Sequence, residues 1–186
     1  LNAGGGLHAF YGIVESCRII GNSAAYGGAA AGCHALFINC LVADNQATDG
    51  GLAFNNCDGV ITLCTVAKNS GAGSAVAWDC DGPIHNCIFW DNQAVTFVDS
   101  SVPGHCCFPD SDGTGGNLYQ DPQFVFPGVY HLRSGSPCID AGTEDPPSGV
   151  PYKDLYGQDR LVDGTGLGQP IVDMGAAEFD PVGPLM

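Results

Sequence analysis

Acidic side chains gather in the last quarter of the chain, where they could bind a hard cation. Four candidate ligands lie on or beside glycine-rich segments: Asp140, Asp159, Asp163 and Asp173. Calcium takes about six to eight oxygen ligands, which carboxylates and backbone carbonyls supply. The sequence favours aspartates that form turns on a solvated surface, and a calcium site is kept as the alternative. Arg160 lies among these carboxylates and is expected to pair with Asp140 or Asp173, which would hold the tail against the last coil.

Catalytic chemistry on polysaccharides would require either a cation beside a base or paired carboxylates facing a groove. Asp44 and Asp91 occupy equivalent positions of the repeat described below, but Gly21 and Lys68 interrupt that line. The five histidines recur at no common position. The sequence therefore indicates no catalytic residue, and a polysaccharide lyase or hydrolase is kept as one alternative function.

The ten cysteines contain no Cys-x-x-Cys pair, which argues against a zinc site. Seven of them fall into two regularly spaced series: Cys17, Cys40, Cys64, Cys87 and Cys33, Cys57, Cys80. Stacked thiols and bridges between neighbouring copies are both compatible with the spacing of strands, and buried thiols are favoured because parallel side chains reach the disulfide dihedral poorly. A disulfide is expected instead in the irregular part, among Cys106, Cys107 and Cys138.

The spacing of the first cysteine series reveals a repeat of about 23 residues. The steps between its members are 23, 24 and 23 residues, and the same steps separate the four asparagines Asn22, Asn45, Asn69 and Asn92. The repeats are rich in Val, Ile, Phe, Thr, Cys and Gly, which favours strands over helices. A strand-rich repeat of this length predicts an all-β fold, a single-stranded parallel β-helix.

Aligned copies place like residues in columns that should face the interior. Two apolar columns are Val14, Phe37, Ile61, Ile84 and Ile19, Val42, Val66, Phe89. The parity between them is broken, so we expect a corner of each coil at the residues just before the cysteines 17, 40, 64 and 87. The asparagines are expected to occupy turns, with stacked amides that bond the coils above and below.

The chain divides into three parts by its pattern. Residues 1–101 are predicted to form the regular coils, 102–140 the last irregular coils with an inserted loop, and 141–186 a loop-rich acidic C-terminal cap or tail. No segment that resembles a cap precedes the first coil, so we expect either that further coils stand upstream of it or that another molecule, most simply a second copy, covers it.

Residues 117–180 contain several short segments in a recognisable order. The segments are Asp-Pro-x-Phe from Asp121, Tyr-x-Leu from Tyr130, Ser-Pro-Cys-Ile-Asp-Ala-Gly from Ser136, Asp-x-x-Gly-x-x-Arg from Asp154 and Asp-Met-Gly-Ala-x-Glu from Asp173. Their order resembles the C-terminal region of bacterial right-handed β-helix surface proteins of the choice-of-anchor type. The resemblance implies right-handed coiling and a position at the cell surface, and no defined activity.

The amino-acid composition excludes some classes of partner and suggests where the protein acts. A net charge of −15 with only five Lys and Arg excludes nucleic acids and anionic membranes as partners, and no apolar run is long enough to cross a bilayer. Few lysines and many Asp, Gly and Cys residues suggest a secreted or cell-surface protein. We expect a non-catalytic extracellular structural protein, a surface or fibre subunit that assembles head to tail. The alternative is a glycan-binding adhesion module that uses exposed aromatic residues: Tyr26, Trp78, Trp90 and Tyr119.

Overall fold

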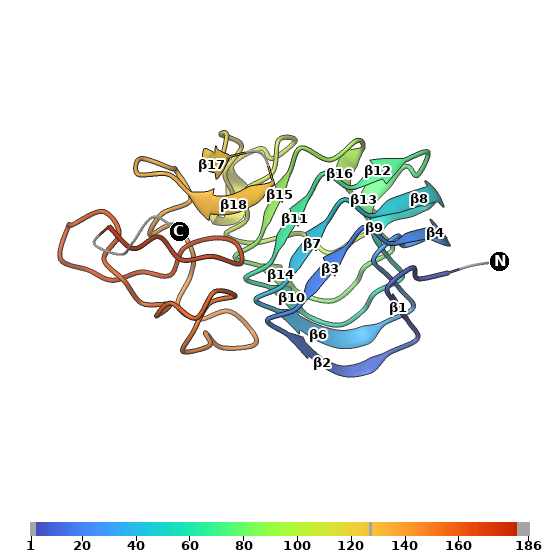
Figure 1. The fold of residues 1–186 in the computed structure, drawn as a ribbon, viewed down its shortest axis with the longest axis horizontal. Coiled ribbons are helices and arrows are strands. Elements are labelled where there is room, and N and C mark those ends of the chain that lie inside the picture. The colour runs from blue at the N-terminus through green and yellow to red at the C-terminus, as the bar shows by residue number, and fades with distance from the viewer. Residues whose placement is uncertain (1–2, 127, 182–186) are drawn as a thin grey trace.

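The computed structural model describes residues 3–126 and 128–181. It is a parallel β-solenoid of about four turns, with about 23 residues in each turn (Figure 1). This architecture confirms the fold predicted from the repeat. A fifth, two-stranded antiparallel sheet and a long segment without strands follow the coils.

Successive coils contribute strands to four parallel sheets, here called sheets I to IV, and among the described residues the fourth coil adds none to sheet IV. Sheet I contains β1 (Leu7–His8), β5 (Ala30–Ala31), β9 (Gly51–Asn55), β13 (Ala75–Trp78) and β16 (Val95–Val98). Sheet II contains β2 (Tyr11–Glu15), β6 (His34–Ile38), β10 (Ile61–Thr62) and β14 (Ile84–His85). Sheet III contains β3 (Arg18–Ile20), β7 (Leu41–Ala43), β11 (Thr65–Ala67) and β15 (Ile88–Trp90). Sheet IV contains β4 (Ser23–Tyr26), β8 (Gln46–Asp49) and β12 (Ser70–Gly71).

Left-handed residues make the corners between the sheets. The corner between sheets II and III has a positive φ at four equivalent positions, as the broken parity of the columns predicts: Ser16, Asn39, Leu63 and Asn86. The corner between sheets III and IV has it at Gly21, Asp44, Lys68 and Asp91. Hydrogen bonding between coils continues through these corners, because the N–H of Ser16 donates to Ile38 O at 3.0 Å and that of Gly21 to Ala43 O at 3.1 Å.

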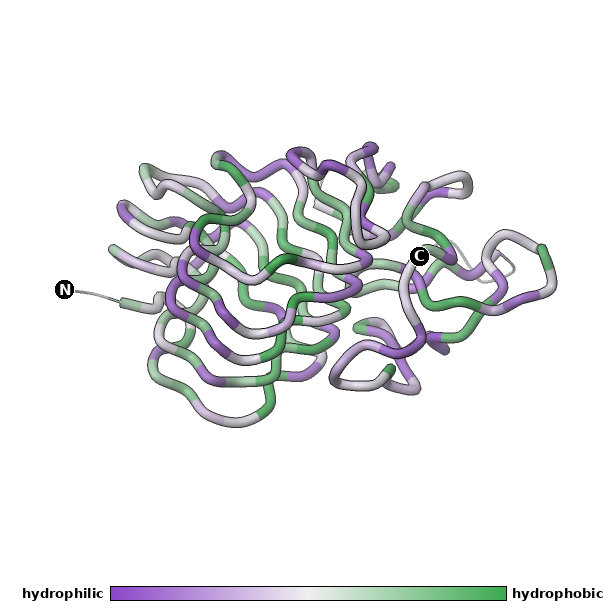
Figure 2. The backbone as a smooth tube through the Cα atoms, turned by 180° about the vertical axis from the view of Figure 1, so that it is seen from behind, coloured by the Kyte–Doolittle hydropathy of each residue, from purple (hydrophilic) through white to green (hydrophobic). Residues whose placement is uncertain are grey.

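The interior is filled by the two predicted apolar columns. Val14 pairs in register with Phe37, and Phe37 and Ile84 both pair with Ile61, so that like positions lie above one another. The column that starts at Ile19 is in register in the same way. Both columns belong to one buried cluster. Figure 2 shows the coils as a stack of parallel turns with the C-terminal segment beside them.

An incomplete further turn closes the C-terminal end of the stack. Isolated bridges join Gly104 to His85, and Cys107 to both Ile88 and Leu118. Phe108 packs edge-on against Phe97 and is buried with the inner core. A short 3-10 turn, η1 (Thr114–Gly116), lies in the connecting loop. None of the helices in the described ranges is long and apolar enough to cross a membrane.

The remaining chain folds back along the side of the stack. The strands β17 (Phe124–Phe126) and β18 (Val129–Leu132) form an antiparallel hairpin, and 133–181 contain no further strand among the described residues. Thr143 bonds to Asn86 in the fourth coil, Lys153 to Asn39 in the second, and Tyr156 lies 5.1 Å from the Arg18 guanidinium in the first. The tail therefore covers the flank at the corner of sheets II and III. The expectation that it packs against the last coil was wrong in this respect.

The outer face of sheet III explains this placement. Its outward residues are apolar and would be exposed without the tail: Leu41, Ala43 and Ala67 pack with Tyr130, and Ile88 packs with Cys138 and Met174. Burying these side chains favours the folded-back tail at roughly 25 cal/mol for each Å² of apolar surface removed from water. Sheet III is thus covered on both faces, like most parallel sheets.

Candidate functional site

The four regularly spaced asparagines lie in one column on the inner side of the corner between sheets III and IV. The side-chain amide of Asn22 donates to Asn45 Oδ1, that of Asn45 to Asn69 Oδ1, and that of Asn69 to Asn92 Oδ1, each at 3.0 Å. The same oxygens accept the backbone N–H of the asparagine in the preceding coil. Each side chain thus satisfies backbone groups that the corner would otherwise leave unpaired.

The asparagines do not themselves adopt the left-handed conformation that asparagine tolerates in turns. The residue before each one does, for example Asp44 with φ 55° and Lys68 with φ 54°. This shift by one position directs the amides inward, where Asn45 and Asn69 are fully buried. The side chains of Asp44, Lys68 and Asp91 consequently form a second column on the outside of the corner.

All ten cysteines are free thiols in the structure, and nine of them are buried. In the series that starts at Cys17, the backbone N–H of Cys40 points at Cys64 Sγ (3.4 Å) and that of Cys64 at Cys87 Sγ (3.5 Å). Cys106 continues this inward column, because its Sγ lies 3.3 Å from Cys87 N. The second series, Cys33, Cys57 and Cys80, lies in the same buried core.

The disulfide expected among Cys106, Cys107 and Cys138 is not present. Cys106 faces the core of the solenoid, whereas Cys107 lies in the cluster under the tail together with Cys138. Consecutive residues of an extended chain point to opposite sides, so these two neighbours cannot share a partner. The Cys107 thiol and burial raise the pKa of the Cys138 thiol, which keeps it protonated.

Thiol labelling checks the arrangement of the cysteines. Cys17 is the exposed thiol, and we expect native protein treated with iodoacetamide to gain one adduct, at Cys17, by intact-mass spectrometry. Its labelling should accelerate as the pH rises, because the thiolate reacts and burial together with Cys40 raises the Cys17 pKa. Labelling of several cysteines in the folded protein would contradict the buried columns.

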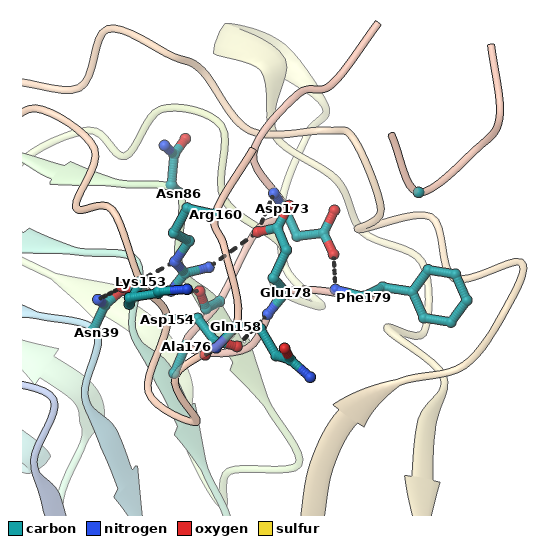
Figure 3. A network of polar contacts seen from close by, with 12 residues as sticks. Asn39, Asn86, Lys153, Asp154, Gln158, Arg160, Asp173, Ala176, Glu178 and Phe179 are labelled. Atoms are coloured by element: carbon teal, nitrogen blue, oxygen red, sulfur yellow. Dashed lines mark hydrogen bonds and ion pairs between the residues drawn. The ribbon is translucent and has the colours of Figure 1, made fainter. Parts of the chain in front are cut away.

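A buried polar cluster fastens the tail to the flank (Figure 3). Arg160 is 1 % exposed; its Nη1 lies 3.4 Å from Glu178 Oε2, and its Nε and Nη2 donate to Asn39 Oδ1 at 3.2 and 2.5 Å. Its Nη2 also donates to Gly175 O at 3.0 Å. The ion-pair partner of Arg160 is therefore Glu178, and the expected pairing with Asp140 or Asp173 was wrong.

Asn39 and Asn86 anchor this cluster on the solenoid. The Asn39 amide donates to Lys153 O at 2.6 Å, while Asn86 exchanges two 2.8 Å hydrogen bonds with the backbone of Thr143. Both are buried and left-handed, a combination that asparagine tolerates well. Sequence reasoning missed this role. The available signal was that asparagine occupies this corner in alternate coils, at positions 39 and 86, whereas the other two coils have Ser16 and Leu63 there.

Three buried carboxyl groups, those of Asp154, Asp173 and Glu178, lie around one guanidinium. Burial raises the pKa of Asp173 to about 7, and burial together with Asp173 raises that of Glu178 to about 9, with Arg160 acting in the opposite direction on both. Glu178 Oε1 is buried without a hydrogen-bond partner, which makes the charged form costly. The cluster therefore retains a proton at neutral pH, despite the short Arg160–Glu178 separation.

These raised pKa values predict a falling stability with rising pH. A carboxyl whose folded pKa exceeds its ordinary value stabilises the fold most while protonated, and this contribution is lost as pH rises through the folded pKa. We expect the free energy of unfolding to fall between about pH 5 and pH 9, measured by urea denaturation. The Glu178→Gln variant should show a flatter profile. Parallel profiles for the two proteins would contradict the proton assignment.

The four predicted calcium ligands do not come together. Asp159 pairs with Lys153 at 2.7 Å on the surface, and Asp163 accepts the N–H groups of Leu167 and Gly168. Asp173 Oδ1 accepts the Asp140 N–H at 2.7 Å, and the Asp140 carboxylate accepts the N–H groups of residues 164 and 165. Within 3–126 and 128–181, no group of three or more His, Cys, Asp or Glu is placed to hold a metal ion. A calcium ion here stays a prediction without a preformed site.

A pocket of about 330 Å³ opens between sheet III and the hairpin β17–β18. Residues at the ends of β11 and β15 form one side of the pocket. The hairpin forms the other side together with Asp121, which stands three residues before β17. The lining residues are Ala67, Lys68, Trp90, Asp91, Asp121, Phe124, Gly128 and Tyr130. The rings of Phe124 and Tyr130 meet edge to face at 5.3 Å.

Asp91 and Lys68, two members of the column noticed in the sequence, line the pocket. Because Ala67 pairs in register with both Ala43 and Trp90, the next residues place Lys68 between Asp44 and Asp91 along the corner. Asp121 joins them from the hairpin side, with its Oδ1 accepting the Gln123 N–H at 2.8 Å. Tyr130 is 6 % exposed, and its hydroxyl has no hydrogen-bond partner.

Comparisons with known proteins add no relative: no protein-family model, curated protein or solved structure matches this chain. The β-solenoid therefore stands on the structure itself. The resemblance to bacterial choice-of-anchor surface proteins depends on the short C-terminal segments alone.

Proposed function

We propose that this protein is a non-catalytic extracellular structural subunit, whose coils assemble head to tail with other copies. The observation that carries the proposal is the way its buried polar groups are used. The asparagine column joins one coil to the next, and the Arg160 cluster joins the tail to the coils. Such contacts favour a rigid, durable rod.

Exposed apolar residues in the first coil and in the last turns are available for contacts between copies. In the first coil, Tyr11 and Ile13 on β2 are 70 % and 65 % exposed. In the last turns, Val95, Val102 and Tyr119 are 52 %, 86 % and 58 % exposed. A contact between two unlike ends is heterologous, and it gives open filaments when its rotation does not close a ring.

The backbone at the edge of the first coil could also contribute to contacts between copies. The strands β2 and β3 are the terminal members of sheets II and III, so one side of each has no neighbouring strand in the described chain. Strand edges of this kind pair readily with another chain. The acidic composition with few lysines suits an extracellular setting. Two copies that each carry a net charge of −15 repel one another, so the contact between their ends would depend on apolar side chains.

Sedimentation velocity and negative-stain electron microscopy test this function. We expect wild-type protein to form filaments as its concentration rises, and Ile13→Asp to remain monomeric with an unchanged melting temperature. Leu167→Asp is the matched control, since Leu167 is 83 % exposed on the tail, away from the stack ends, and should leave filaments intact. Monomers of the wild type at every concentration would overturn the proposal.

A further inference from the structure

The pocket between sheet III and the hairpin has the features of a small-molecule site, and the proposed structural role makes no use of it. Its volume of about 330 Å³ lies at the small end of the range for ligand pockets, roughly 300–1,000 Å³. Aromatic side chains and a few polar groups line it together. The same combination, apolar walls with convergent polar atoms, is typical of binding sites in general.

Aromatic rings provide flat apolar surfaces in this pocket. Trp90 is partly exposed at the end of β15, and Phe124 and Tyr130 come from the two strands of the hairpin. An indole that keeps one part in solvent offers a face on which the C–H side of a sugar ring can pack. The volume of the pocket suits one ring better than an extended chain.

Polar side chains line the pocket together with these rings. Lys68 and Asp91 occupy the same position in neighbouring coils, and strands of neighbouring coils lie about 4.8 Å apart. Asp121 approaches from the opposite side, where its bond to the Gln123 N–H holds the carboxylate in place. Two acceptors and one donor at fixed positions fit a ligand with several adjacent hydroxyl groups.

The charge of the pocket selects among sugars. Two carboxylates line it against one ammonium group, and Asp44 lies next to Lys68 on the other side. With a net charge of −15 on the whole chain, an acidic sugar would be repelled. We propose that this pocket binds one pyranose ring of a neutral oligosaccharide, stacked on Trp90 and hydrogen-bonded by Lys68, Asp91 and Asp121.

Calorimetric titration with defined hexasaccharides tests the proposal. The probes are cellohexaose, mannohexaose, maltohexaose, xylohexaose and chitohexaose, with hexagalacturonate as the acidic comparison. We expect saturable binding of at least one neutral probe and none of hexagalacturonate. Trp90 fluorescence should change with the same saturation curve in a Trp78→Phe background, because these are the two tryptophans of the chain.

Two variants locate the binding and are matched by controls. Trp90→Ala and Asp121→Ala should each weaken binding by about tenfold or more, whereas Trp78→Phe on β13 and the exposed Asp81→Ala should leave it unchanged. Asp121 is exposed, so its variant remains informative if Trp90→Ala fails to fold. The proposal is overturned if no neutral probe binds, if Asp121→Ala binds as the wild type does, or if hexagalacturonate binds equally well.

Discussion

Replacing Arg160 by methionine is expected to lower the free energy of unfolding by about 3–5 kcal/mol, because several buried acceptors lose their hydrogen-bond donor and each such loss costs about 1–3 kcal/mol. Arg160 is 1 % exposed, and its loss would leave Glu178, Asn39 Oδ1 and Gly175 O without their donor. Methionine preserves most of the buried volume, so the effect reports the lost polar contacts rather than a cavity. Urea denaturation followed by circular dichroism measures it.

Lys153→Met is the matched control for this prediction. Lys153 pairs with Asp159 in the same tail at 2.7 Å, but both side chains are about half exposed. Exposed pairs of this kind contribute about 0–1 kcal/mol, so the control should unfold almost as the wild type does. Equal losses in the two variants would show that the buried cluster does not hold the tail.

Replacing Asn69 by leucine is expected to cost about 3 kcal/mol of unfolding free energy, since each buried group left unpaired costs about 1–3 kcal/mol. Asn69 Oδ1 accepts both the N–H and the amide of Asn45, and its own amide donates to Asn92 Oδ1 and to Val42 O. Leucine is similar in size and can make none of these bonds. The loss should appear in thermal and urea unfolding alike.

Asn22→Leu tests the same contact where it is partly solvated. Asn22 lies in the first coil, where it is half-buried, and its side-chain amide donates to Asn45 Oδ1 at 3.0 Å. Water can replace part of what is lost there, so the cost should stay below about 1 kcal/mol. A cost equal to that of Asn69→Leu would mean that burial of the column is not what makes it stabilising.

The coils could be predicted because identical spacing repeats the same local physics. The apolar columns that start at Val14 and Ile19 are both in register, and the corner lies at Ser16 and its equivalents. Equivalent residues of successive repeats adopt the same local structure and stack on one another, so the structure of one copy predicts that of the next. The repeat spacing does not continue into 133–181, so it could not predict the path of that segment.

The position of the tail was nevertheless indicated in one place. Outward positions of sheet III are apolar in several coils, as at Leu41, Ala67 and Ile88, although a solvated face should be polar. Near-continuous apolar strands of this kind call for a covering layer on their second face. The identity of the contacts, such as Arg160 with Asn39 across 121 residues of sequence, is set by tertiary packing and has no local signal.

The pocket was only half visible in the sequence for the same reason. Lys68 and Asp91 belong to the repeat and could be aligned, and Trp90 stood out as a large aromatic residue. Asp121, Phe124 and Tyr130 reach the site from the hairpin, whose return onto sheet III follows no period. The repeat spacing therefore allows the residues on one side of the pocket to be predicted, but not those on the other side.

Hydrogen exchange measured by mass spectrometry tests most directly the central claim, that the tail is fixed along the flank of the coil stack. The account predicts slow exchange for the amides of Asp173, Glu178 and Phe179, comparable with those of the inner coils, because each donates to a buried carboxylate. In Arg160→Met the tail should exchange faster while the coils remain protected. Tail amides that exchange in the wild type as fast as an unfolded peptide would contradict the account.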